Sequence, residues 1–289
     1  MDQDSSTLPE ALDSQKPSVS YVVEPAKAWP AINLKELWSY RNLAYFLAWR
    51  DIKLQFKQTV LGAAWAILQP LSLALVFSFV FSFLFTMESI KVPYLVFFFS
   101  GMVPWTLFSQ SLNSSANSIV GDSALIQKVY FPRLLLPFAS ALPALVDFLF
   151  AFVVLLGMGL FYGLIPGFRI LLIPFLVILC LVNSVGVGLW FCALNVKYRD
   201  ARYLLPLTQT IWMYLTPVFY PFSMLPPKYQ FLFSFNPMVG VVEGFRWCLY
   251  DTQALPVGFL VTSSLTAITV FILGAFYFRR CEETFADEL

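Results

Sequence analysis

Long apolar blocks separated by short polar connections dominate the chain. A helix that crosses the hydrocarbon core of a membrane needs roughly 20 mainly apolar residues. Six blocks meet this requirement, at residues 59–87, 93–115, 134–163, 170–195, 203–222 and 255–278. The pattern predicts an all-α integral membrane protein with six transmembrane helices within a permease-like region at 58–289.

Residues 223–252 are also apolar, but prolines and glycines interrupt them. Broken backbone at membrane depth is tolerated where it is buried in protein or lines a cavity. We therefore expect a re-entrant pair of short helices between spans five and six. This segment contains Pro226, Pro227, Pro237, Gly240 and Gly244, and it carries Lys228, Glu243 and Arg246.

The segment before the first span has a different pattern. Apolar and aromatic residues recur at helical spacing over residues 31–57, and basic residues lie between them. This predicts an amphipathic helix in the membrane interface, with Trp and Tyr at headgroup depth. It is either a plain anchor or a collar that also contacts a cytosolic partner. Residues 1–30 are polar and proline-rich and predict a disordered tail, and they lack the apolar core of a signal peptide.

The composition limits the function. The chain is 59% hydrophobic and 12% charged, whereas a soluble domain has about 25% charged residues, so a soluble enzyme is excluded. The chain has no His, four scattered Cys and a net charge of +1. We therefore expect no catalytic residues, no bound metal and no nucleic-acid partner, and we interpret the Cys residues as small apolar side chains.

Basic residues set the orientation, because cytosolic loops are enriched in Lys and Arg. With the N-terminus inside, most basic residues fall in cytosolic segments, and both termini are expected in the cytosol. The outer segments then hold only Lys91, Arg169, Lys228 and Arg246.

No Gly is followed by Lys, so the chain lacks a GxxxxGK[ST] phosphate loop. Any ATP and Mg²⁺ must be bound by another subunit, and we expect this chain to bind no cofactor. Asp147 is the one clear acid inside a predicted span. It is either an ion site or an acid buried at a helix contact.

Residues 119–137 connect spans two and three. Asp122 is placed to cap a short helix that starts near Ser123, and Pro132 lies beyond its end. We expect a short exposed helix beneath the membrane, with an ordinary loop as the alternative.

Aromatic residues gather in several spans. Tyr and Trp combine an apolar face with a polar tip, and aromatic faces that stack on sugar rings suit a sliding polysaccharide. The predicted channel aromatics are Trp212, Tyr214, Phe219, Tyr220, Phe81, Phe85 and Trp105. The alternative for those in span one is contact with lipid or other helices.

Four segments in this order resemble the permease subunit of bacterial polysaccharide ABC exporters, the O-antigen and teichoic-acid type within the type-2 ABC exporter group. They are RDIKLQFKQTVLGAAWAILQPL (50–71), GDSALIQKVYFPRLLLP (121–137), KYRDARYLLPLTQTIWMYLTPVFYP (197–221) and FNPMVGVVEGFRWCLYD (235–251). The resemblance implies a homodimer in the bacterial inner membrane with two copies of an ABC ATPase. It implies export of an undecaprenyl-pyrophosphate-linked glycan through a channel formed by both permeases. Teichoic acid, capsule or a small hydrophobic compound or lipid remain alternative cargoes.

The resemblance also implies roles for residues. Arg50, Lys53 and Lys57 would meet the lipid pyrophosphate at the cytosolic entrance, although they would serve equally as topology signals. The ATPase would dock on Asp122, Gln127, Lys128 and Tyr130. The segment at 223–252 would form the extracellular gate, held by Asn236, Glu243 and Arg246, with Glu243 and Arg246 three residues apart on one helix.

Overall fold

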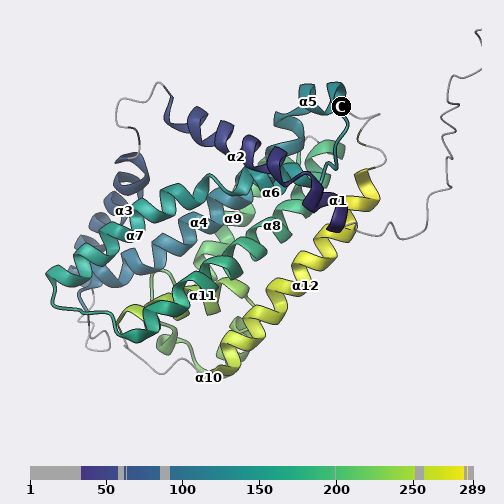
Figure 1. Cartoon of the computed structure of the whole chain (residues 1–289). Coiled ribbons are helices and arrows are strands. Elements are labelled where there is room, and N and C mark those ends of the chain that lie inside the picture. Colours follow the sequence, from purple (N-terminus) through teal and green to yellow (C-terminus); the bar gives the residue numbers. More distant parts are fainter. Residues whose placement is uncertain are drawn as a thin grey trace, which may run out of the picture.

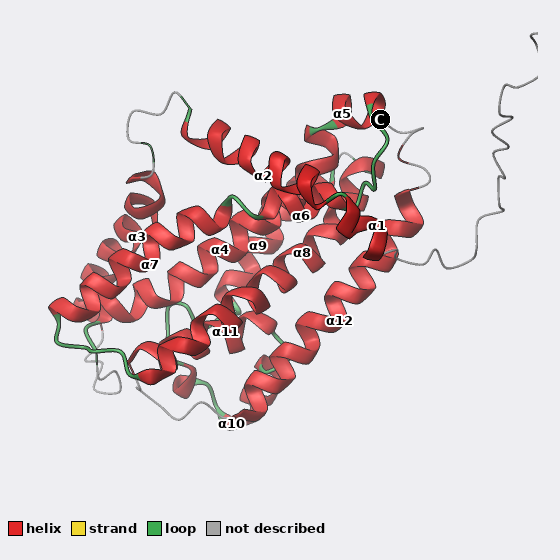
Figure 2. Cartoon of the chain, viewed as in Figure 1, coloured by secondary structure: helices red, strands yellow, loops and turns green. Residues whose placement is uncertain are grey.

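A computed structural model describes residues 34–57, 62, 64–84, 92–198, 200–250, 257–282 and 285. Within these residues the chain forms helices and turns and no strand (Figure 2). The helices are α1 (Leu34–Ser39), α2 (Arg41–Phe56), α3 (Ala64–Leu84), α4 (Tyr94–Gly121), α5 (Ser123–Lys128), α6 (Leu135–Ala141), α7 (Ala144–Phe161), η1 (Phe168–Leu172), α8 (Ile173–Lys197), α9 (Ala201–Tyr214), η2 (Phe222–Met224), α10 (Pro227–Phe233), α11 (Pro237–Tyr250) and α12 (Val257–Glu282).

Five stretches of the described chain are long and apolar enough to cross a membrane: α3, α4, α6 with α7, η1 with α8, and α12. Helix α4 is the centre of the bundle, because it packs against α3, α6, α7, α8 and α11 (Figure 1). Helix α12 packs along α8 at the edge of the bundle. The predicted all-helical membrane architecture is therefore confirmed.

Within the predicted fifth span, at residues 203–222, the α-helix covers only the first part. Helix α9 ends at Tyr214 after 14 residues, which at 1.5 Å per residue is about 21 Å, short of the roughly 30 Å hydrocarbon core. Turns follow, because Pro217 disfavours helical backbone at the residue before it. The six-span count is accordingly not confirmed among the described residues.

The interrupted segment forms two helices, α10 and α11, as its prolines predicted. Helix α11 is the buried member and packs against α4, α8 and α12. Two glycines allow this approach: a Cβ on Gly240 would lie 2.5 Å from the Ser263 side chain, and one on Gly244 would lie 3.0 Å from Leu176. Whether the pair is re-entrant stays a prediction.

The predicted interface helix is present as two pieces, with a break at Tyr40. One face of α2 packs on α6 through Leu47 and Ala48. The aromatic side chains predicted to contact the membrane, among them Tyr45 and Trp49, are exposed on other faces of the helix. The helix is therefore apolar on two faces, one against the protein and one open to its surroundings.

The cysteines have the environment that the sequence indicated. Cys180, Cys192 and Cys248 are buried, Cys281 is half-buried, and all four are free thiols. The tail at residues 1–30 and the predicted channel residue Phe85 lie outside the described residues.

Candidate functional site

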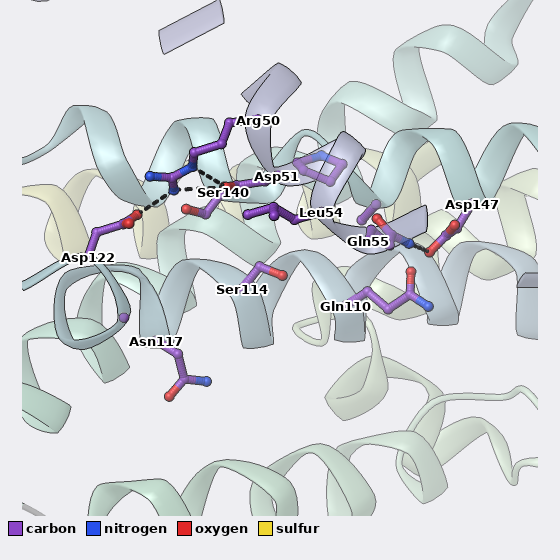
Figure 3. Close-up of a pocket in the computed structure, with 13 residues that line it drawn as sticks. Arg50, Asp51, Leu54, Gln55, Gln110, Ser114, Asn117, Asp122, Ser140 and Asp147 are labelled. Atoms are coloured by element: carbon purple, nitrogen blue, oxygen red, sulfur yellow. Dashed lines mark hydrogen bonds and ion pairs between the residues drawn. The ribbon is translucent and has the colours of Figure 1, made fainter. Parts of the chain in front are cut away.

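A pocket of about 550 Å³, with several polar side chains in its lining, lies beneath α2, between this helix and the bundle (Figure 3). It is walled by α2, the second half of α4, the end of α6 and the start of α7. Its lining residues are Arg50, Asp51, Leu54, Gln55, Gln110, Ser114, Asn117, Gly121, Asp122, Ser140, Pro143, Ala144 and Asp147. Its volume lies within the range of small-molecule sites, so the pocket is large enough to hold a ligand.

One face of α4 supplies the floor of this pocket. Gln110, Ser114, Asn117 and Gly121 follow one another at intervals of four, three and four residues, which places them along one stripe of a helix. The sequence interpretation did not single out this stripe. Its signal was available, because small and polar residues at this spacing interrupt an otherwise apolar span.

Arg50 connects α2 to the beginning of α5. Its Nη2 donates to Asp122 Oδ2 at 2.8 Å, and its Nε donates to Asp51 Oδ1 at 2.8 Å. The hydrogen bond to Asp122 raises the pKa of Arg50 above its usual value, so the guanidinium stays charged. Asp122 is the N-cap residue of α5, and this helix begins at Ser123 as predicted. The expected side-chain capping bond is absent, because the Asp122 carboxylate is directed to Arg50 instead.

A second contact connects the end of α2 to α7. Gln55 Nε2 donates to Asp147 Oδ2 at 2.6 Å. Asp147 is buried, and it lies in the wall of the pocket (Figure 3). The geometry therefore places the acid of span three at a helix contact that also borders a cavity.

The predicted pyrophosphate entrance is not assembled as one site. Of its three residues only Arg50 lines the pocket. Lys53 and Lys57 are exposed, and Lys53 Nζ lies 5.5 Å from the centroid of the Trp49 ring. The guanidinium that does line the pocket is already paired with two carboxylates.

The predicted ATPase-docking residues lie around α5, which stands at the edge of the bundle near α1 and α2 (Figure 1). Gln127, Lys128 and Tyr130 are exposed, and Tyr130 is 86% exposed. The chain beyond α5 is fixed to the last helix. Arg133 Nη1 donates to the carbonyl of Glu282 at 2.8 Å, and the backbone N–H of Arg133 donates to Glu282 Oε1 at 3.2 Å.

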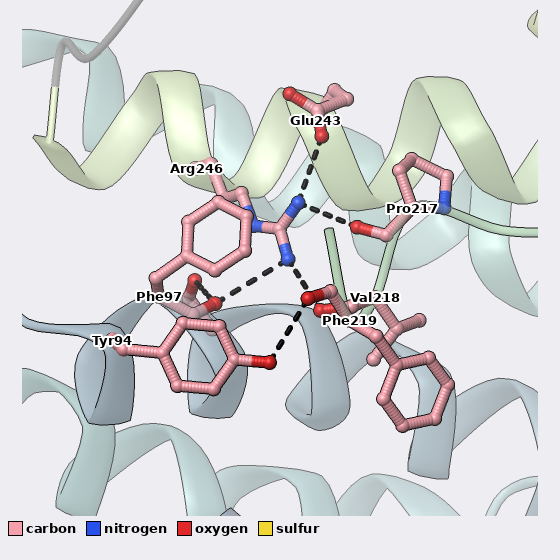
Figure 4. Close-up of polar contacts among 8 residues, drawn as sticks. Tyr94, Phe97, Pro217, Val218, Phe219, Glu243 and Arg246 are labelled. Carbon is pink, nitrogen blue, oxygen red and sulfur yellow. Dashed lines mark hydrogen bonds and ion pairs between the residues drawn. The ribbon is translucent and has the colours of Figure 1, made fainter. Parts of the chain in front are cut away.

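A second polar cluster is centred on Arg246 of α11, which is only 2% exposed (Figure 4). Its Nη1 donates to Glu243 Oε1 at 2.8 Å and to the carbonyl of Pro217 at 2.6 Å. Its Nη2 donates to the carbonyl of Val218 at 2.8 Å and to that of Phe97 at 3.4 Å. The predicted pairing of Glu243 with Arg246 is thus confirmed, and the same guanidinium holds the turn after α9 against α4.

Asn236 holds the other end of the same region. Trp212 Nε1 donates to Asn236 Oδ1 at 2.7 Å, and Asn236 Nδ2 donates to the Leu215 carbonyl at 3.2 Å. The backbone N–H of Met238 also donates to Asn236 Oδ1 at 3.0 Å. One amide side chain therefore joins α9 to the start of α11.

The predicted channel aromatics fall into two groups. Trp105 and Phe219 are buried in the core, and the Phe219 ring packs 5.0 Å from Phe77 and 5.4 Å from Phe98. These two rings pack against other side chains and not against open space. Tyr214 is 58% exposed, whereas Trp212, Tyr220 and Phe81 are half-buried.

The geometry can now be compared with known proteins. Residues 42–250 match the family described as ABC-2 type transporter. The chain is 26% identical to the O-antigen export system permease protein RfbA of Myxococcus xanthus over 89% of this chain and 98% of that protein. It is 26% identical to a protein of the same name from Klebsiella pneumoniae, over 83% of this chain and 92% of that protein. It is 27% identical to the polysialic acid transport protein KpsM of Escherichia coli, over 81% of this chain and 91% of that protein.

The matched region includes every residue that lines the pocket beneath α2 and the whole Arg246 cluster. Together with five apolar helices of spanning length, it covers most of the chain. The chain belongs to the ABC-2 type transporter family.

Proposed function

We propose that the chain is the permease subunit of an ATP-driven exporter that moves a lipid-linked, O-antigen-like polysaccharide out of the cytosol. The observation that carries this proposal is the near full-length correspondence with a permease named for O-antigen export, over 89% of this chain and 98% of that relative. The undecaprenyl-pyrophosphate carrier comes from the resemblance alone.

Capsule export is the second candidate. It is favoured by the correspondence with a polysialic acid transport protein over 81% of this chain and with a capsule polysaccharide export protein of Neisseria meningitidis over 74%. Both candidates share the export of a long glycan, and they differ in the sugars and in the carrier. Membership of the ABC-2 type transporter family argues against the alternative that Asp147 is the ion site of an ion-coupled transporter.

In this proposal a separate ATPase binds ATP and Mg²⁺ and docks on α5. Support comes from the exposed side chains of Gln127, Lys128 and Tyr130, which have no role in packing. Two permease chains and two ATPase chains form the complex. Movement of α5 would reach the bundle by two contacts: Arg50 of α2 bonds to Asp122 at the start of α5, and Arg133, which follows α5, bonds to Glu282 of α12.

The membrane arrangement is part of the proposal. Both termini lie in the cytosol of a bacterial inner membrane, and α2 lies at headgroup depth with its exposed Trp and Tyr side chains in the interface. Helix α9 with the following turn forms a discontinuous span. Helices α10 and α11 form the re-entrant pair at the extracellular side, where Asn236, Glu243 and Arg246 hold the gate.

The channel is formed between two copies of the chain. Among the predicted aromatics that the structure describes, Tyr214 presents the most exposed ring. We therefore assign sugar contact first to this residue, with Trp212 and Tyr220 beside it. The burial of Trp105 and Phe219 gives them a supporting position behind the channel wall.

Deletion of the gene in its native host tests the proposal. We expect loss of surface polysaccharide on gels, cytosolic accumulation of the lipid-linked glycan, and recovery with the wild-type gene. Tyr214→Ala should lower surface polysaccharide, while Phe168→Ala, a control at an exposed ring after α7, should not. Unchanged surface polysaccharide in the deletion strain would refute the proposal.

A further inference from the structure

The pocket beneath α2 contains polar side chains that its own chain leaves without partners. Within the described residues, the side chains of Gln110, Ser114 and Ser140 make no hydrogen bond, although all three line the same cavity. Ser140 is only 8% exposed, so its hydroxyl has little access to solvent except through the pocket. Gln110 and Ser114 are half-buried, so three side chains with unused hydrogen-bonding capacity face one cavity, where they can bind a polar ligand.

These groups come from two sides of the cavity. Figure 3 shows Gln110 and Ser114 on the side of α4 that faces Leu54 and Gln55, with Ser140 near Arg50 and Asp51. An amide offers both donors and an acceptor, and each hydroxyl offers one donor and accepts as well. One carboxylate oxygen of Asp147 accepts a hydrogen bond from Gln55, and the carboxylate can accept further hydrogen bonds from a ligand. The ligand must therefore both donate and accept hydrogen bonds.

The charge of the lining argues against an anion. The pocket is lined by three carboxyl groups, on Asp51, Asp122 and Asp147, and by one guanidinium, which is already bonded to Asp51 and Asp122. A phosphate or pyrophosphate would enter a region with excess negative charge and find the one cation occupied. A metal ion fits no better, because no three His, Cys, Asp or Glu side chains of the described chain converge as ligands.

A neutral group with several hydroxyls fits the mixture of donors and acceptors in the lining, and it needs no free cation. Each sugar hydroxyl donates one hydrogen bond and accepts others, which matches the mixture of amide, hydroxyl and carboxylate groups. The cavity volume of about 550 Å³ exceeds the lower limit of about 300 Å³ for ligand pockets. Polar groups within a membrane-spanning segment are typical of a substrate pathway.

We propose that each chain binds a neutral sugar unit of the exported glycan in the pocket beneath α2, through Gln110, Ser114 and Ser140. This inference rests on the proposed function, because it takes the cargo to be a polysaccharide. It moves the phosphate-bearing part of the cargo away from this pocket and assigns the pocket to the glycan. The pocket would then recognise sugars before they enter the channel.

The test uses the complex of permease and ATPase in lipid nanodiscs. The probe is an oligosaccharide of one to three repeat units, cut from the surface polysaccharide of the native host and labelled with a fluorophore. Fluorescence anisotropy gives its Kd. We expect Gln110→Ala, Ser114→Ala and Ser140→Ala each to weaken binding about threefold to tenfold, the loss expected for one hydrogen bond.

Ser109→Ala is the matched control. Ser109 lies on the same helix next to Gln110, but its hydroxyl donates within α4 to the Thr106 carbonyl and does not line the pocket. Its Kd should equal that of the wild type. Elution volume and unfolding temperature of each variant identify any loss of folding, and each Ser→Ala substitution removes only one oxygen atom.

Three results would overturn the inference. The first is an oligosaccharide that does not bind, and the second is binding that the three pocket variants leave unchanged. The third is displacement by inorganic pyrophosphate with an affinity that the same variants weaken, which would assign the pocket to phosphate. If the pocket variants keep the wild-type Kd while the deletion strain loses its surface polysaccharide, only the assignment of the pocket is refuted. If the deletion strain keeps its surface polysaccharide, both the proposed function and the assignment of the pocket are refuted.

Discussion

Arg246 illustrates how a single side chain can hold a region that has little regular structure. Its guanidinium is bonded to one carboxylate and three backbone carbonyls, and it lies 3.7 Å from the centroid of the Phe97 ring. The turn at residues 215–221 lacks helical hydrogen bonds for most of its carbonyls, so it depends on this donor. A planar fork of five donors suits the task, and a lysine ammonium does not.

We therefore expect Arg246→Met to destabilise the chain strongly. Removing one member of a buried ion pair costs about 3–5 kcal/mol, because the other charge is left unpaired. The variant should unfold at a clearly lower temperature in detergent, measured by the intrinsic fluorescence of its tryptophans, and Arg246→Lys should recover only part of the loss.

Arg202→Met is the control for this comparison, because Arg202 is exposed on α9. It should unfold close to the wild-type temperature. If Arg246→Met did the same, Arg246 would not hold the turn.

The residues of the pocket mark the limit of prediction from sequence at this scale. The polar stripe on α4 and the embedded acid of α7 were visible as exceptions to an apolar pattern. Their partners were not, because Gln55 lies 92 residues from Asp147 and Arg50 lies 72 residues from Asp122. The pairing of Glu243 with Arg246 could be predicted because both residues lie on one helix.

At the scale of elements, the close approach of neighbouring helices depends on glycine. A Cβ on Gly186 of α8 would lie 2.7 Å from the Phe271 Cα of α12. Membrane helices associate through small residues of this kind, which allow backbones to meet. The contact between α8 and α12 is therefore set by backbone atoms that cannot move aside independently.

Gly186→Ala should force α8 and α12 apart and destabilise the chain by about 1–3 kcal/mol, the usual cost of overpacking. Gly157→Ala on α7 is the matched control, because a Cβ there meets nothing within 4 Å. This control should be neutral or slightly stabilising, since alanine favours a helix more than glycine. Equal unfolding temperatures for the two variants would contradict the close contact.

The connection between α2 and α5 is a second feature at this scale. Because Arg50 and Asp122 are partly exposed, their pair contributes only about 0.2–1 kcal/mol to stability. We expect Arg50→Ala to leave the unfolding temperature almost unchanged while it lowers surface polysaccharide in cells, because α2 would no longer follow α5.

Exchange of the two charges separates this role from others. The double variant Arg50→Asp, Asp122→Arg restores the attraction and should recover part of the surface polysaccharide that either single variant loses. Failure of the exchange to recover any export would show that the pair does not act as a mechanical connection.

Element types were predicted well because apolar block length is a strong signal in a membrane protein. The residues at which helices begin and end were predicted poorly where proline and packing determine them. Helix α4 continues six residues beyond the expected end at Ser115, because its last turns are buried although they are polar. The third span is divided at Pro143 into α6 and α7, and α9 includes Pro206 but stops before Pro217.

At the scale of the whole molecule, apolar side chains are exposed around α9, as they also are on α3, α7 and α12. Leu207, Ile211 and Leu215 are all exposed on this helix and its end, and an apolar pocket of about 530 Å³ lies between them and α10, α11 and α12. We attribute this surface to a second copy of the chain, as the proposed function requires.

Leu207→Trp should therefore reduce the proportion of complexes with two permeases and two ATPases, measured by native mass spectrometry from nanodiscs. Val153→Trp on α7 is the control at another exposed apolar position, and it should leave the stoichiometry unchanged. Equal stoichiometry in both variants would place the contact between permeases elsewhere.

The contrast between α3 and α4 has a mechanical consequence. In their membrane-spanning windows 78% of α4 but only 11% of α3 is buried within the chain. A helix with so few fixed neighbours can tilt or slide while the bundle around α4 keeps its packing. Exchanging lipid for another apolar surface changes the free energy little in a membrane. In the proposed exporter, a passage for a bulky cargo would therefore widen by displacement of α3 at low cost, without separation of the helices around α4.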